Sequence, residues 1–219
     1  MSEHQELKDY LDLNFSQEDE PLKWIREHSA EHGLPNINIS PYMGRFLYLM
    51  AKIHQPKKIL EIGTLGGYST VWLAKAVPEA KMISLEINPH YVKLARKHLE
   101  KYSLSHRVEI REGHGVDLLS QIAQKQEGPF DLFFLDADKE NNILYLDWAI
   151  HLSRPGSLIL IDNVIPKGPK GGIPGNKEAV SIYAFNDYLT KQPAIEVAAI
   201  TTLNRHGLDG MAIALRKDT

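Results

Sequence analysis

Acidic and amide side chains follow two apolar runs in the second half of the chain. Asp136 comes directly after Phe-Asp-Leu-Phe-Phe-Leu, and Asp162 and Asn163 follow Ser-Leu-Ile-Leu-Ile. Such runs are typical of buried parallel strands, which lie about 5 Å apart when they are neighbours. Two carboxylates and an amide oxygen that face one another form a site suited to Mg²⁺ or another divalent cation. The alternative is one helix cap and one turn, because Asp and Asn are common in both.

A second constellation lies earlier, in Lys-Ile-Leu-Glu-Ile-Gly-Thr-Leu-Gly-Gly-Tyr-Ser at residues 58–69. Glycines at 63, 66 and 67 allow a sharp turn from strand to helix, and Glu86 ends the next apolar run, where it can hold a ribose diol. The spacing Gly-x-x-Gly-Gly differs from the Gly-x-Gly-x-x-Gly of dinucleotide sites. It favours S-adenosylmethionine, which has a ribose and an amino acid but no phosphates. The alternative is a plain tight turn followed by an exposed acid.

Lys139 is the candidate base, since it lies three residues after Asp136. The alternative is a solvated lysine paired with Asp138 or Glu140. His114 and His206 fall at a strand end and in a turn, where they could line a site or simply face water. Zinc ligation is not expected, because most of the ten histidines are scattered on polar stretches and the chain has no cysteine.

Strand-length apolar runs alternate with helical segments from residue 57 onward. This alternation predicts a doubly wound, mostly parallel α/β sheet of seven strands with helices on both faces. Asn204 to Gly207 and Asp209-Gly210 are turn signals, so we expect the last two strands to form an antiparallel hairpin at one edge. We predict strands at 57–63, 81–87, 107–112, 130–136, 157–162, 195–201 and 210–216, and helices at 67–77, 89–102, 115–126, 140–152 and 177–191.

The first five predicted strands each end in an acid at the edge where ligands bind in such sheets. These acids are Glu61, Glu86, Glu112, Asp136 and Asp162. The opposite strand ends show nothing comparable, which favours a binding role for this edge.

The composition is that of an ordinary globular protein with one sizeable core. The 219 residues are 43% hydrophobic and 24% charged, with a net charge of −3. The absence of a basic run argues against nucleic-acid binding. No segment approaches the roughly 20 apolar residues of a membrane span, and the N-terminus does not resemble a secretion signal. A cytoplasmic protein with a small-molecule substrate is the default expectation.

Two regions stand apart from the alternating pattern. Residues 1–56 carry no strand signal, and helical segments at 3–13, 18–32 and 40–54 predict a helical region packed on a main domain at 57–219. Residues 164–176 form the one stretch that is dense in glycine and proline. Because this stretch follows a strand directly, we expect it to be a lid over the site.

The motifs together resemble the cation-dependent, S-adenosylmethionine-dependent O-methyltransferases of the catechol and caffeoyl-CoA type. The resemblance runs from about Asn38 to Lys217. It rests on Leu-Glu-Ile-Gly-Thr-Leu-Gly-Gly-Tyr-Ser at 60–69, Leu-Glu-Ile-Asn-Pro at 85–89, Leu-Asp-Ala-Asp-Lys at 135–139, Ile-Asp-Asn at 161–163 and Leu-Asp-Gly at 208–210. It implies a Rossmann-like methyltransferase fold and methyl transfer to a hydroxyl of a small, vicinally dihydroxylated aromatic acceptor. A homodimer is also implied.

The resemblance further implies a role for each matching residue. Asp136, Asp162 and Asn163 would coordinate Mg²⁺, with Lys139 as general base and Asp136 also part of the catalytic and cofactor site. Glu86 would bind both ribose hydroxyls. The methionine part of the cofactor would be held by Glu61, Gly63, Thr64 and Ser69, the adenosine would be bordered by Gly115 and Asp138, and Ile39 falls in the N-terminal contact segment.

Two positions depart from the family pattern, and rival functions remain open. Met43 stands where members often carry an acid, and Leu65 stands where an aromatic residue is found. The rivals are a cation-independent methyltransferase, a nicotinamide-dependent dehydrogenase and a catalytically silent cofactor-binding protein.

Overall fold

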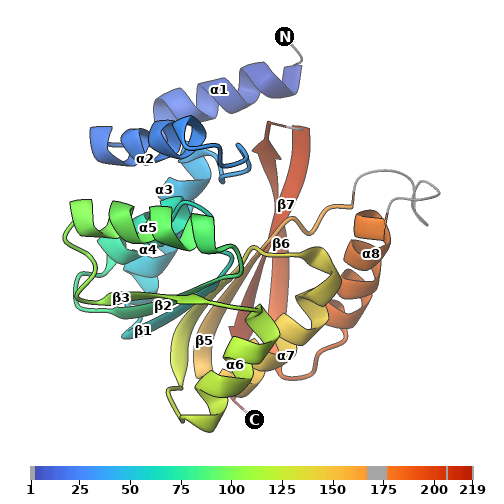
Figure 1. The fold of residues 1–219 in the computed structure, drawn as a ribbon. Helices are drawn as coiled ribbons and strands as arrows, with labels where there is room; N and C mark the ends of the chain where they lie inside the picture. The colour runs from blue at the N-terminus through green and yellow to red at the C-terminus, as the bar shows by residue number, and fades with distance from the viewer. Residues whose placement is uncertain (1–2, 167–176, 206, 219) are drawn as a thin grey trace.

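A single seven-stranded sheet organises the computed structural model, which describes residues 3–166, 177–205 and 207–218. The strand order is β3-β2-β1-β4-β5-β7-β6, and β7 runs antiparallel to both of its neighbours, β5 and β6, whereas the other pairs are parallel (Figure 1). The predicted doubly wound sheet with an antiparallel edge is therefore confirmed. The strands are β1 (Lys58–Ile62), β2 (Lys81–Glu86), β3 (Val108–Glu112), β4 (Phe130–Leu135), β5 (Ser153–Asp162), β6 (Ile195–Asn204) and β7 (Gly207–Arg216).

The last two strands are longer than the sequence pattern indicates. Asp209 and Gly210 lie inside β7, paired with Thr202 and Thr201 of β6, so the interpretation of Asp209-Gly210 as a turn is wrong. Asp209 can occupy a strand because its carboxylate is buried and hydrogen-bonded, which offsets its poor strand propensity. The chain turns between Asn204 and Gly207 instead.

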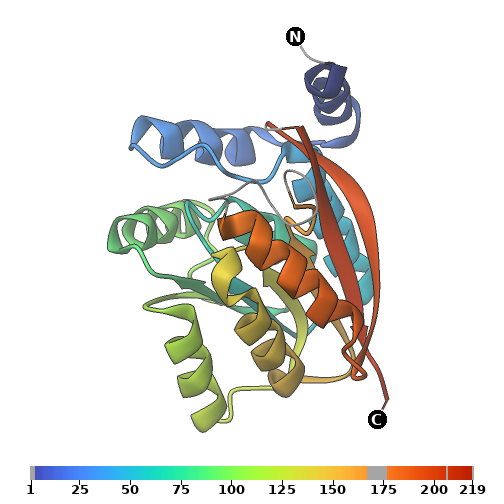
Figure 2. The same ribbon diagram turned by 90° about the vertical axis from the view of Figure 1, so that its right-hand side faces the viewer.

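Helices cover both faces of the sheet (Figures 1 and 2). One apolar cluster joins α2, α3, α4 and α5 to one face, and a second joins α6, α7 and α8 to the other. The helices are α1 (Glu3–Phe15), α2 (Glu20–Glu31), α3 (Pro41–His54), α4 (Tyr68–Ala76), α5 (Pro89–Lys101), α6 (Gly115–Gln124), α7 (Asn142–Leu152) and α8 (Lys177–Thr190), with a 3₁₀ turn η1 (Lys139–Asn141) before α7.

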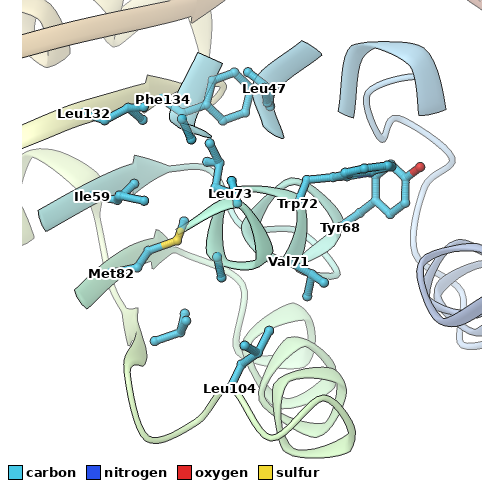
Figure 3. Packing of buried hydrophobic residues seen from close by; sticks show 14 of the residues in the cluster. Leu47, Ile59, Tyr68, Val71, Trp72, Leu73, Met82, Leu104, Leu132 and Phe134 are labelled. Atoms are coloured by element: carbon cyan, nitrogen blue, oxygen red, sulfur yellow. The ribbon is translucent and has the colours of Figure 1, made fainter. Parts of the chain in front are cut away.

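Strand β4 contributes side chains to both apolar clusters, one on each face of the sheet. All six of its residues are buried. Leu132 and Phe134 point into the first cluster, while Phe133 and Leu135 point into the second. Figure 3 shows the first cluster, where Leu132 and Phe134 lie near Leu47 of α3. Burial of each large apolar side chain contributes about 2 kcal/mol, so an apolar run without alternation is stable only between two helix layers.

The N-terminal helices contact the start of α4 through polar side chains. Glu18 accepts two hydrogen bonds from Arg26 and one from the hydroxyl of Tyr68, at 2.5–2.7 Å. His28 of α2 is hydrogen-bonded to the buried His98 of α5 at 2.8 Å. These contacts tie residues 16–31 to the strand-to-helix turn of the sheet. In the described residues, no helix has both the length and the apolarity to cross a membrane.

Asp131 fastens the opposite end of the sheet. Its Oδ2 accepts the backbone N–H groups of Lys57 and Lys58 at 2.7 and 2.9 Å, and its Oδ1 accepts Nε of Arg154 at 2.7 Å. The carboxylate is buried and bridges β1, β4 and β5. It therefore holds three central strands in register at the end remote from the acids.

We predict that Asp131→Asn lowers the free energy of unfolding by about 1–3 kcal/mol, because an amide NH₂ would then face a donor of Lys57, Lys58 or Arg154. Urea denaturation followed by circular dichroism measures the change. Asp187→Asn is the control, since the Asp187–Lys191 pair is 68% and 71% exposed and such pairs contribute little. Equal stability of the two variants would contradict this role of Asp131.

Candidate functional site

The turn after β1 requires glycine for two separate reasons. Gly63 has φ +99°, and a Cβ there would overlap the carbonyl oxygen of Asp136 on the neighbouring strand. Gly67 has φ +81° and caps the N-terminus of α4. The close approach brings the ends of β1 and β4 together, so the glycine turn and the Asp136 loop form one continuous edge of the candidate site.

Two histidines support the glycine turn after β1 through hydrogen bonds. His98 is fully buried, and its Nδ1 lies 2.7 Å from the carbonyl oxygen of Gly66. Because a carbonyl only accepts, Nδ1 carries the proton and Nε2 accepts from His28. Burial lowers the pKa of His98 to about 4, so the ring is neutral and the arrangement holds at neutral pH. Helix α2 thus reaches the glycine turn through two rings.

Glu61 lies at the centre of a closed network of hydroxyls. Its Oε1 accepts from Ser69 Oγ at 2.6 Å, and its Oε2 accepts from Ser84 Oγ at 2.6 Å and from Thr70 Oγ1. Thr64 Oγ1 lies 2.5 Å from Ser84 Oγ. The carboxyl is fully buried, and this burial raises its pKa to about 7. Glu61, Thr64 and Ser69 are therefore brought together, and their contact with a cofactor stays a prediction.

Glu86 ends β2 beside the glycine turn. Its Oε2 accepts the backbone N–H of Leu65 at 2.8 Å, and its Oε1 accepts the N–H of Asn88 at 2.9 Å. Leu65 itself adopts the left-handed conformation, with φ +49°. Each carboxylate oxygen retains a second lone pair, so a fixed Glu86 can still accept both hydroxyls of a diol.

Asp138 and Gly115, the two positions expected to border the adenosine, both lie against Tyr145. Tyr145 donates its hydroxyl to Asp138 Oδ1 at 2.6 Å, and Asn141 donates Nδ2 to Oδ2 at 2.5 Å. A Cβ at Gly115 would come within 3.0 Å of the Tyr145 ring. The tyrosine therefore connects the two positions. Sequence reasoning missed Tyr145 and Asn141, because they belong to the helix after the motif.

Ile39 and Met43 contribute no polar atom to this edge. Both are buried in the apolar cluster under α3 and α4. The neighbouring Ser40 and Tyr42 are instead hydrogen-bonded to the backbone of Leu203 in β6. The predicted cofactor contact of Ile39 is not tested by this arrangement.

The candidate metal ligands meet at the ends of β4 and β5. Leu135 pairs with Ile161, so Asp136 and Asp162 follow neighbouring positions of two parallel strands. Desolvation and the charge of Asp136 raise the pKa of Asp162 to about 8. Two carboxylates held this closely repel each other unless a proton or a cation lies between them.

Asn163 and Lys139 complete the group. Asn163 adopts φ +60°, and its Nδ2 donates to Asp209 Oδ2 at 3.0 Å. Lys139 Nζ lies 3.3 Å from Asp136 Oδ1, and its side chain is only 10% exposed. Two carboxylates and the free amide oxygen of Asn163 form a hard oxygen donor set that fits Mg²⁺. Across the ranges that the structure describes, no cluster of three His, Cys, Asp or Glu side chains could hold a metal, so the fit depends on the amide.

The remaining candidates are placed less informatively. Glu112 ends β3 and His114 follows this strand, and both are exposed. His206 and residues 167–176 of the predicted lid lie outside the described residues. Of the lid, Val164 is fixed by hydrogen bonds to Gly210 and Asn186. Thr70 and Ser84 were missed as parts of the site because hydroxyls carry no distinctive sequence signal, and Asp209, although part of the Leu-Asp-Gly motif, was assigned to a turn.

We predict that Glu61→Gln gains stability relative to the native chain as pH rises. The folded-state pKa of Glu61, about 7, lies above its ordinary value of 4.5, so the folded state binds more protons between these values. Stability of the native chain therefore falls as pH rises through this window, by up to about 3 kcal/mol from this group. Denaturation curves at pH 5 and pH 8 test this; a difference that is independent of pH would contradict it.

Comparison with known proteins agrees with this geometry. Residues 13–217 match the O-methyltransferase family model. A catechol O-methyltransferase of Niastella koreensis is 39% identical over 95% of this chain and 95% of its own length. One from Mycobacterium tuberculosis is 40% identical, covering 94% and 93%.

Solved structures give the same result. An O-methyltransferase of Bacillus cereus, solved in complex with SAH (S-adenosylhomocysteine), superposes with a TM-score of 0.90 at 36% identity, covering 96% of this chain and 97% of its own. The family rules out the dehydrogenase alternative. The chain belongs to the O-methyltransferase family and is an S-adenosylmethionine-dependent enzyme of the catechol and caffeoyl-CoA type.

Proposed function

We propose that the enzyme transfers a methyl group to one hydroxyl of a vicinally dihydroxylated aromatic acceptor and requires a divalent cation. The observation that carries the proposal is the pair Asp136 and Asp162, which ends adjacent strands with Asn163 beside it. Relatives named catechol O-methyltransferase support the acceptor class. Two adjacent hydroxyls match a centre that offers open coordination positions on one side.

The side chains have separate tasks in this proposal. Asp136, Asp162 and Asn163 would hold Mg²⁺, and Lys139 would accept the proton of the reacting hydroxyl at its Nζ. When bound, Mg²⁺ lowers the pKa of a chelated hydroxyl and S-adenosylmethionine supplies the methyl group. The side chain of Lys139 is largely shielded from solvent and lies 3.3 Å from Asp136, which places it beside the proposed ligand group. Catalysis then depends mainly on how closely the chain positions the acceptor oxygen against the methyl donor.

Cofactor binding would use the other end of the same edge. Glu86 would accept the ribose hydroxyls, and Asp138 and Gly115 would border the adenosine. Gly63, Thr64, Ser69, Glu61 and Ile39 would surround the methionine part. The support is that Glu86 and Asp138 are both anchored, by backbone N–H groups and by Tyr145 respectively, so they lose little freedom on binding.

We predict that Asp136→Ala lowers turnover by at least about 100-fold, while affinity for S-adenosylmethionine changes only a few-fold. EDTA should abolish the activity of the native enzyme, and added Mg²⁺ should restore it. The assay is methyl transfer to catechol, caffeoyl esters and flavonoids, with calorimetry for the cofactor.

Asp187→Asn, an exposed carboxylate on α8, is the matched control and should behave as the native enzyme. Equal loss of turnover and cofactor affinity in Asp136→Ala would overturn this division of roles. Full activity in EDTA would favour the cation-independent methyltransferase. The absence of methyl transfer with every acceptor would favour a silent cofactor-binding protein.

A homodimer is proposed on a different observation. Helix α1 has no buried residue. It exposes Leu7, Tyr10, Leu13 and Phe15, while α3 exposes Leu49 and Ile53. An amphipathic helix with an uncovered apolar side gains stability when a second copy covers it.

We predict that the protein sediments as a dimer and that Leu13→Glu combined with Ile53→Glu shifts it to a monomer. Both side chains are highly exposed, at 84% and 77%, so the substitutions leave the fold of one chain intact. Sedimentation velocity measures the shift. A monomeric native protein, or a dimer indifferent to both changes, would contradict this interface.

A further inference from the structure

Asp209 is a buried carboxylate that the proposed mechanism does not use. It lies in β7 with an exposed fraction of 2%. Its Oδ2 accepts Nδ2 of Asn163 at 3.0 Å and Nδ2 of Asn204 at 2.7 Å, and its Oδ1 accepts the N–H of Gly210 at 2.8 Å. Burial of a carboxylate costs free energy, which its hydrogen bonds must offset. A carboxylate buried at this position therefore indicates a role in the structure or in the site.

We propose that Asp209 is a positioning residue for the cation centre, because it fixes the amide of Asn163 so that Oδ1 is the atom presented to the cation. The proposal rests on the cation dependence proposed above. An asparagine amide has an NH₂ group, which donates hydrogen bonds, and an oxygen, which accepts them. Rotation of the amide group exchanges the positions of the two. A carboxylate accepts hydrogen bonds only, so it admits one of the two orientations.

The backbone around Asp209 holds the two side chains in register. Asp162 pairs with Met211 across β5 and β7, and Val164 donates its N–H to the carbonyl of Gly210 at 3.0 Å. A Cβ at Gly210 would come within 2.7 Å of Ile165, so this approach leaves no room for a side chain. The ends of β5 and β7 are therefore packed closely, and Asp209 meets Asn163 at a fixed distance.

The charge of Asp209 supports the same role. The negative charge of Asp209 raises the pKa of the Asp162 carboxyl, as the charge of Asp136 also does. A carboxylate outside the ligand set adds to the attraction for a cation without occupying a coordination position. Asp209 can therefore contribute both orientation and charge.

Mn²⁺ titrated into the full-length enzyme, with free Mn²⁺ measured by electron paramagnetic resonance, tests the proposal. We expect Asp209→Asn to weaken Mn²⁺ binding by about 10–100-fold, the usual range for residues that orient metal ligands. Affinity for S-adenosylmethionine should stay within about threefold, measured separately by calorimetry.

Asp131→Asn is the matched control, since it removes a buried carboxylate from the same sheet at the opposite strand ends. It should leave Mn²⁺ affinity unchanged although it destabilises the fold. If both variants weaken Mn²⁺ binding equally, the effect is one of stability and the proposal is overturned.

A double variant that exchanges the side chains of residues 163 and 209 gives a test that does not depend on the stability of Asp209→Asn alone. In Asn163→Asp combined with Asp209→Asn, the new amide can donate to the new carboxylate, so the hydrogen bond is kept with its direction reversed. We expect this double variant to bind Mn²⁺ at least about fivefold better than the product of the two single losses. Additive losses would overturn the proposal.

The native enzyme and the single variant distinguish the two proposals. If the native enzyme binds no Mn²⁺, the cation dependence itself fails. If the native enzyme binds Mn²⁺ and Asp209→Asn binds it equally well, only the positioning role fails.

Discussion

The repulsion between Asp136 and Asp162 is the constraint on which the rest of the site depends. Parallel strands β4 and β5 place both carboxylates at the same edge, and burial makes two negative charges there costly. A divalent cation relieves this cost, and the relief is available only while the strands keep their register. Asp209, which accepts a hydrogen bond from Asn163, supports the arrangement at this edge.

The second constraint is the contact between the ends of β1 and β4. Gly63 lies against the carbonyl of Asp136, so the glycine turn and the loop that carries Asp136 share one backbone contact. His98 fixes the other end of the turn through Gly66, and Glu61 fixes the start of α4 through Ser69 and Thr70. In the proposed function, the same few backbone groups would position the methyl donor and the acceptor.

Sequence reasoning predicted most of the fold because this sheet has simple signals. Apolar runs without alternation, such as β4, have only one stable environment, and the glycines and acids at their ends indicate the binding edge. The strand β7 was misjudged at Asp209-Gly210, since a pair that usually marks a turn is stabilised here by partners from β5 and β6.

The side chains that support the site could not be predicted in the same way. Thr70, Ser84 and Tyr145 act through side-chain hydrogen bonds from one element to another, and their residue types are common everywhere. The pairing of His28 with His98 joins residues 70 positions apart. Such contacts follow from packing of the helices, which a single sequence does not encode locally.

Anomalous diffraction from crystals grown with Mn²⁺ tests the central claim most directly. We expect one strong peak bound by carboxylate oxygens of Asp136 and Asp162 and by Oδ1 of Asn163, at about 2.2 Å. A peak elsewhere, or none between these side chains, would contradict it.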